Sequence, residues 1–189
     1  MKIGVDCPEC LVHRAFVETY KATTDETRRI EIAIEVLKAI ADSLTPDAVP
    51  GVVGTLREKV IQRETQNRDL YAQEKKNSNA SALKLLPIVS ERINKIKDDL
   101  ERFRFATRLS AIGNLIEFDI LGYSARLDDL DAQIRNVKFG IDDSDQAYRL
   151  FRSSRRVLLL TDNAGEIVFD LPLVKELKRS GSYVTVAVK

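Results

Sequence analysis

The chain has 189 residues, with 30 basic and 29 acidic side chains, so its formal net charge is +1. This balance gives no argument for a nucleic-acid partner or a membrane surface, and no apolar run is long enough to span a bilayer. With only two cysteines and no signal-peptide core among its first residues, the sequence favours a cytoplasmic enzyme.

Both cysteines and the only histidine lie close together near the N-terminus, at Cys7, Cys10 and His13. This spacing supplies three zinc ligands, whereas a structural zinc site needs four and the chain has no further Cys or His. A thioredoxin-like dithiol would follow a strand, but the flanking sequence here is helical. We therefore expect a small buried thiol pair at the start of a helix, with His13 as a packed or surface residue.

From about Glu9 to Phe151 apolar residues recur at helical spacing, which predicts an almost entirely helical region. One helix is expected over roughly residues 24–44, opened by a capping box of Thr23 and Glu26. Another is expected to begin after Pro50 and to continue toward Thr65. The core face of the 24–44 helix is expected to comprise Ile30, Ile34, Leu37, Ala41 and Leu44.

A longer helix is expected after Asn79. Its core stripe, spaced by three and four residues, comprises Leu86, Val89, Ile93, Ile96, Leu100 and Phe103. The acidic cluster of Asp128, Asp129 and Asp131 lacks the glycine of a calcium-binding loop, so we interpret it as a solvated face. The turn from Asp142 to Asp145 is expected to cap a short helix that ends near Arg152.

The sequence from residue 155 onward has the pattern of a β-α-β crossover. An apolar strand at 157–160 is followed by helical spacing from Glu166 to Arg179, a Gly181 stop and a second apolar strand from Tyr183 to Val188. The predicted fold class is therefore α+β to α/β. An all-helical domain is expected over residues 1–154, and the start of a three-layer α/β domain with a parallel sheet over residues 155–189.

The first strand stops abruptly on Asp162 and Asn163, at the strand end where ligands bind in open α/β sheets. A carboxylate and an amide oxygen suit Mg²⁺ or Mn²⁺. Gly-rich dinucleotide and Walker-type motifs are absent, and Ala164 stands where an aspartyl-phosphate enzyme would need a second acid. We therefore predict that Asp162 is a metal ligand and that the backbone amides around Ala164 to Glu166, including that of Gly165, hold a phosphate. A simple helix-capping role for Asp162 or Asn163 fits the turn equally well.

Four segments, in this order, carry the motifs of a known family. They are Cys7-Pro-Glu-Cys10; Asp69-Leu-Tyr71 with Lys75, Asn79 and Leu83-Lys-Leu-Leu-Pro87; Arg108-Leu-Ser-Ala-Ile-Gly-Asn-Leu-Ile-Glu-Phe-Asp119; and Leu160-Thr-Asp-Asn-Ala-Gly-Glu-Ile-Val-Phe-Asp170. Over nearly its whole length the chain resembles the metal-dependent damage-control phosphatases, also called acidic-residue-methyltransferase-like. It departs from the family at Leu70, where Pro is usual, and at Glu117, where Asp is usual.

The resemblance implies that Asp162 and Asn163 are both catalytic and metal-binding, with Mn²⁺, Co²⁺, Ni²⁺ or Mg²⁺ as the cofactor. It also implies that Asn114 and Lys75 bind phosphate or substrate beside Gly165 and Glu166, with Glu117 and Asp119 on the same wall. From the residues alone, Asn114 is as well explained as a helix cap, and Lys75 and Asn79 as solvated helix residues.

In the family a third metal ligand, an Asp, follows the next strand, which would place it beyond Lys189. We therefore expect the chain to be the N-terminal part of a longer protein. The apolar residues Val184, Val186 and Val188 also indicate a longer protein, because a single β-α-β unit would leave them exposed to solvent. Further sequence or a partner chain, including a homo-oligomer, is expected to cover them.

The predicted function is a divalent-metal-dependent phosphatase that hydrolyses small phosphorylated metabolites, such as sugar phosphates or damaged phosphometabolites. Attack by water is expected, since no protein nucleophile is evident. The alternative is a non-catalytic helical scaffold or metabolite-binding module. A methyltransferase is less favoured, because no glycine-rich cofactor loop is visible.

Overall fold

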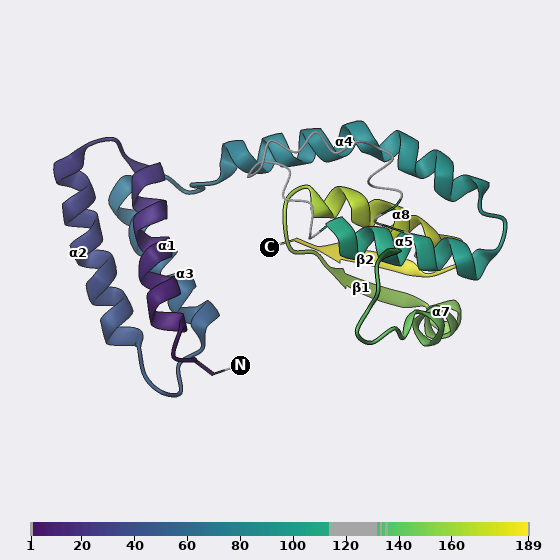
Figure 1. The fold of residues 1–189 in the computed structure, drawn as a ribbon, viewed down its shortest axis with the longest axis horizontal. Coiled ribbons are helices and arrows are strands. Elements are labelled where there is room, and N and C mark those ends of the chain that lie inside the picture. Colours follow the sequence, from purple (N-terminus) through teal and green to yellow (C-terminus); the bar gives the residue numbers. More distant parts are fainter. Residues whose placement is uncertain (1, 114–131, 133, 135, 189) are drawn as a thin grey trace. The chain divides into compact units, whose positions relative to one another are not determined.

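The computed structural model describes residues 2–113, 132, 134 and 136–188 (Figure 1). The chain divides into two compact units, Met1–Ala72 and Gln73–Lys189. This division groups residues by packing, whereas the predicted boundary at 154/155 separates them by type of secondary structure. The domain boundary from the sequence therefore stays a prediction.

The first unit consists of three helices, α1 (Cys7–Ala22), α2 (Glu26–Ser43) and α3 (Pro50–Thr65). The start and end of α3 confirm the helix expected between Pro50 and Thr65. Asp25, rather than Thr23, caps α2, because its side chain accepts a hydrogen bond from the Arg28 N–H. The buried core of this unit comprises Leu11, Ala15, Ile32, Val36, Ile40, Val53, Ile61 and Leu70.

A buried ion pair joins α1 to α3 inside this unit. Arg57 donates two hydrogen bonds to the Glu18 carboxylate, at 2.8 and 2.6 Å. The Tyr71 hydroxyl donates a third to the same carboxylate at 3.3 Å. Because Glu18 is only 3% exposed, these donors compensate a charge that would otherwise be costly to bury.

The predicted core face of α2 is wrong except for Leu44, which packs against the core of the unit. The residues that α2 buries are Ile32, Val36 and Ile40, whereas the predicted Ile30 and Ile34 are 64% and 47% exposed. Leu37 is 38% exposed. Helix α2 thus has two adjacent apolar stripes, and the helical unit itself packs only one of them.

The second unit begins with α4 (Ala72–Lys95) and α5 (Asp99–Gly113). The sequence predicted a single long helix here, beginning after Asn79 and continuing through Phe103. The Asp98 side chain explains the break, because it accepts a hydrogen bond from the Glu101 N–H at 2.9 Å and so starts a new helix. A short helix, α7 (Ser144–Ser153), follows the Asp142 turn as expected.

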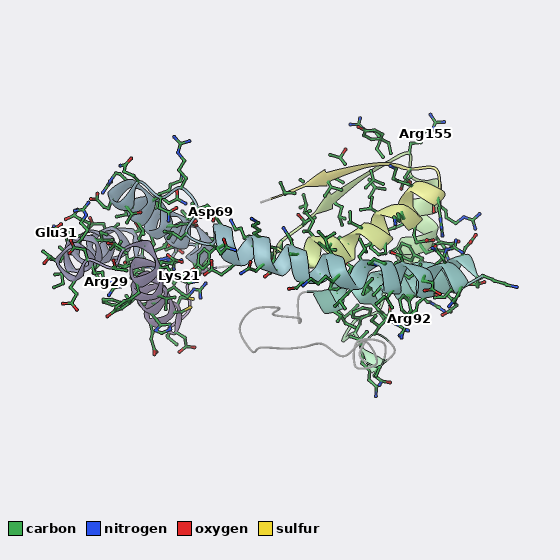
Figure 2. All side chains as sticks on the ribbon, turned by 90° about the horizontal axis from the view of Figure 1, so that it is seen from above. Lys21, Arg29, Glu31, Asp69, Arg92 and Arg155 are labelled. Atoms are coloured by element: carbon green, nitrogen blue, oxygen red, sulfur yellow. The ribbon has the colours of Figure 1, made fainter. Side chains whose placement is uncertain are left out.

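The end of the second unit is the predicted crossover. Strand β1 (Arg156–Leu160), helix α8 (Glu166–Arg179) and strand β2 (Tyr183–Ala187) follow one another, and the two strands pair in parallel with Val157 opposite Val184. The strands lie on one side of α8, and α4 and α5 lie on the other (Figure 2). The fold class is confirmed as a helical region followed by a parallel α/β element.

The core of the second unit lies between α4, α5 and α8. Its buried members are Ala82, Val89, Ile93, Leu109, Ile112, Ile134, Val168 and Phe169. The face of the sheet turned away from α8 stays open, since Leu158 and Leu160 are 62% and 73% exposed. None of the described helices is both long enough and apolar enough to cross a membrane.

Candidate metal and phosphate site

The turn between β1 and α8 carries the predicted site. Strand β1 ends at Leu160, and the Thr161 N–H still bonds the Ala187 carbonyl at 3.0 Å, which aligns the turn with the carboxyl end of the sheet. Gly165 then reverses the chain at φ 84° and ψ −52°. Because a side chain at this φ is strained, glycine is the residue this turn requires.

Asn79 holds the turn from α4. Its side-chain oxygen accepts a 2.7 Å hydrogen bond from the N–H of Gly165, which is buried. Asn79 is therefore bonded to the turn and is not a solvated helix residue, whereas a role for it in a binding site stays a prediction. The Gly165 N–H is occupied by this bond, so the predicted phosphate-binding role of Gly165 stays a prediction.

Lys75 lies on α4 one helical turn before Asn79, and its side chain is exposed. Residues four apart on a helix share a face, so α4 carries an ammonium group on the side that reaches the turn. Asn114, Glu117 and Asp119, like the Asp128–Asp131 cluster, lie outside the described residues. Their sequence neighbour Gly113 packs closely on α8, where an added Cβ would lie 3.2 Å from the Glu166 Cα.

Asn163 links the acidic groups of the turn. Its side-chain nitrogen donates to Asp162 at 3.3 Å and to Glu166 at 3.4 Å, and its backbone N–H also donates to Glu166 at 3.4 Å. Burial raises the pKa of Glu166, and the negative charges of Asp170 and Asp162 raise it further. The hydrogen bond from the Asn163 N–H acts in the opposite direction.

A second carboxylate, Asp170, lies one turn further along α8 and is 5% exposed. Ser110 of α5 donates a 2.6 Å hydrogen bond to it. Burial raises the pKa of Asp170, and the Ser110 hydroxyl partly offsets that effect. The bond fastens α8 to α5 next to the contact between Gly113 and Glu166. The motif from Leu160 to Asp170 contains this carboxylate, but sequence reasoning missed its pairing with Ser110.

The donor set fits a cation that prefers oxygen. Asp162 and Asn163 are exposed at the strand end, and the amide nitrogen of Asn163 is directed to carboxylates. Its oxygen is thus the atom through which Asn163 would bind a metal. Within the described part of the chain, no group of three or more His, Cys, Asp or Glu residues is placed to hold a metal ion. The assignment of Asp162 and Asn163 as metal ligands stays a prediction.

The N-terminal thiols differ from the expectation in one respect. Cys7 is the first residue of α1, which confirms a helix start, but it is only half-buried and Cys10 is exposed. The prediction of a buried thiol pair is therefore wrong for Cys10. His13 is exposed on the same helix, which agrees with a surface role.

The sequence is similar to those of known proteins. Residues 3–189 match the family model described as the damage-control phosphatase ARMT1-like domain. The chain is 30% identical over 190 residues to a damage-control phosphatase of Archaeoglobus fulgidus, covering 100% of this chain and 65% of that protein. It is 28% identical over 191 residues to an uncharacterized protein of Methanocaldococcus jannaschii, covering 100% of this chain and 62% of that protein.

A solved structure shows the same fold. The crystal structure of a DUF89 family protein from Pyrococcus horikoshii superposes with a TM-score of 0.88 at 27% sequence identity, covering 98% of this chain and 64% of that one. The chain spans less than two thirds of the length of each of these relatives.

Proposed function

Since the chain belongs to the family of damage-control phosphatases with an ARMT1-like domain, we propose that it forms the metal- and phosphate-binding part of a divalent-metal-dependent phosphatase. The proposed substrates are small phosphorylated metabolites, such as sugar phosphates or damaged phosphometabolites, handled in the cytoplasm. The observation that carries the proposal is the arrangement of Asp162 and Asn163 at the end of β1, held together by the hydrogen bond between their side chains.

Asp162 and Asn163 would hold Mn²⁺, Co²⁺, Ni²⁺ or Mg²⁺ through their side-chain oxygens. A cation there supplies charge that polarises a phosphoryl oxygen and offsets the negative charge developing in the transition state. Asn163 keeps the Asp162 carboxylate oriented, and Asn79 fixes the backbone at Gly165. These contacts prepare the turn before a ligand arrives, which lowers the reorganisation that binding requires.

The phosphate is proposed to lie at the start of α8, where the helix N-terminus favours an anion. Lys75 adds a positive charge on the face of α4 that reaches this turn. Glu166 opposes an anion when it is ionised, so its role as a substrate-binding residue rests on its backbone N–H.

The first test combines Mn²⁺ calorimetry with hydrolysis of an aryl phosphate, using the chain and a version extended by its natural downstream residues. Asp162→Ala should abolish metal binding and metal-dependent turnover while the circular dichroism spectrum stays unchanged. Asp42→Ala, an exposed acid at the end of α2, is the matched control and should bind as the native chain does. Turnover retained by Asp162→Ala would overturn the assignment.

One observation favours the rival function of a scaffold or metabolite-binding module. The Glu166 carboxylate accepts the Asn163 N–H at 3.4 Å, which resembles the reciprocal side-chain bonding that closes a helix start. On that view the polar residues of the turn only stabilise α8. Absence of Mn²⁺ binding in both the chain and its extended version would support the rival.

A further inference from the structure

Helix α2 carries an apolar stripe that the helical unit leaves open. We call Ile30, Ile34, Leu37 and Ala41 the outer stripe. All four are exposed, and their spacings of four, three and four residues are those of the a and d positions of a coiled coil. Isolated exposed apolar residues are ordinary, but a heptad-spaced row on one helix matches the seam of a helix pair.

Exposed aromatic residues of α1 flank the start of the outer stripe. The Arg29 guanidinium lies 4.5 Å from the centre of the Tyr20 ring, which brings Tyr20 beside the start of the stripe at Ile30. Tyr20 is 61% exposed, and Phe16, one turn earlier on the same helix, is 42% exposed. An apolar patch that crosses two helices marks an interaction site more often than scattered residues do.

Charges beside the stripe are arranged so that the stripe complements itself. Glu31 and Lys38 both occupy the e position, on the same flank, and lie near opposite ends of the stripe. Among the described residues each pairs only within α2, Glu31 with Arg28 and Lys38 with Glu35, and these contacts are solvent-exposed. Glu31 points outward at the rim of the helical bundle (Figure 2).

Antiparallel pairing of two α2 helices brings these charges together. Ile34 then meets Leu37 of the second copy, Ile30 meets Ala41, and Glu31 lies near Lys38 on both sides of the two-fold axis. The same opposite charges that fix this direction also fix the register. The surface therefore fits a second copy of itself, without requiring a partner of different sequence.

We propose that the chain forms a two-fold dimer through the outer stripe of α2, flanked by Phe16 and Tyr20 of α1. This interface is built entirely from the helical unit and is independent of the proposed phosphatase chemistry. The resulting dimer joins four helices, α1 and α2 of each copy, around one apolar seam.

Sedimentation velocity over a wide concentration range tests the dimer, with both the chain and its version extended by natural downstream residues. Ile34→Glu should make both monomeric, because it places a charge at the centre of the seam. Val52→Glu is the matched control, since Val52 is 58% exposed on α3 and lies outside the stripe, and it should leave the dimer intact. Circular dichroism verifies that both variants are folded.

A charge reversal tests the antiparallel register. Glu31→Lys and Lys38→Glu should each weaken the dimer by roughly tenfold, because each replaces two attractive contacts with repulsive ones. The double variant should restore the native affinity. A monomer at every concentration, a dimer that Ile34→Glu leaves intact, or a double variant no stronger than the single ones would overturn the proposal. So would an extended chain that stays monomeric.

Discussion

Asn79→Ala is expected to loosen the β1–α8 turn from a distance. In the native chain the Asn79 oxygen is the acceptor for the buried Gly165 N–H, at 2.7 Å. Alanine keeps the helical propensity of α4 and removes that acceptor. A buried donor that loses its partner costs about 1–3 kcal/mol, which corresponds to a local opening that is roughly 5- to 150-fold more populated.

Hydrogen exchange measured by mass spectrometry resolves this effect at the site. Peptides containing Gly165 and the first turn of α8 should exchange faster in Asn79→Ala, while peptides from the helical unit stay unchanged. Asn77→Ala is the control, because Asn77 lies on the same helix, is exposed and accepts a 2.8 Å hydrogen bond from the exposed Gln73. It should change stability by less than about 0.5 kcal/mol. Equal exchange in the two variants would refute the supporting role of Asn79.

Three further changes test other contacts. Arg57→Ala should lower the free energy of unfolding of the helical unit by roughly 3–5 kcal/mol, because it leaves buried Glu18 without its ion pair. Arg63→Ala, at an exposed arginine, is the control. Equal hydrogen exchange in α1 and α3 of the two variants would contradict this. Gly181→Ala should lower the free energy of unfolding, measured with urea, by about 1–2 kcal/mol. The cost is backbone strain at φ +89° and not a clash, since nothing lies within 4 Å of the added Cβ. Burial raises the pKa of Asp170, so the native chain should lose stability as pH rises above about 4, where the unfolded carboxyl group ionises first. Asp170→Asn should remove that loss, and a stability difference between the two proteins that is independent of pH would disprove it.

The β1–α8–β2 crossover was predictable because its signals are local. The apolar run stops at Asp162, the helical spacing begins at Glu166 and Gly181 ends it, and the observed helix Glu166–Arg179 has the expected bounds. The break between α4 and α5 was harder. Apolar spacing continues through Ile96 and Leu100, and only the capping side chain of Asp98 interrupts the backbone.

Two features could not be read from the sequence. On α2, the apolar stripes of Ile30 and Ile32 are both periodic, and the packing partners of a helix decide which stripe is buried. The contacts of the candidate site were also unpredictable, because they join residues that are far apart in the sequence. Motif resemblance marked Asn79 and Asp170, but the bond of Asn79 to Gly165 and that of Asp170 to Ser110 depend on tertiary contacts.

The bond between Asn79 and Gly165 also constrains the order in which the protein is assembled. Its two residues are separated by 86 positions along the chain, so at about 5–20 residues per second a ribosome needs roughly 4 to 17 s to make the second after the first. The helical unit, whose core lies entirely within the first 72 residues, is synthesised before that interval begins. During it α4 carries an amide acceptor whose donor does not yet exist, so the turn reaches its native form only after the helical unit has been made.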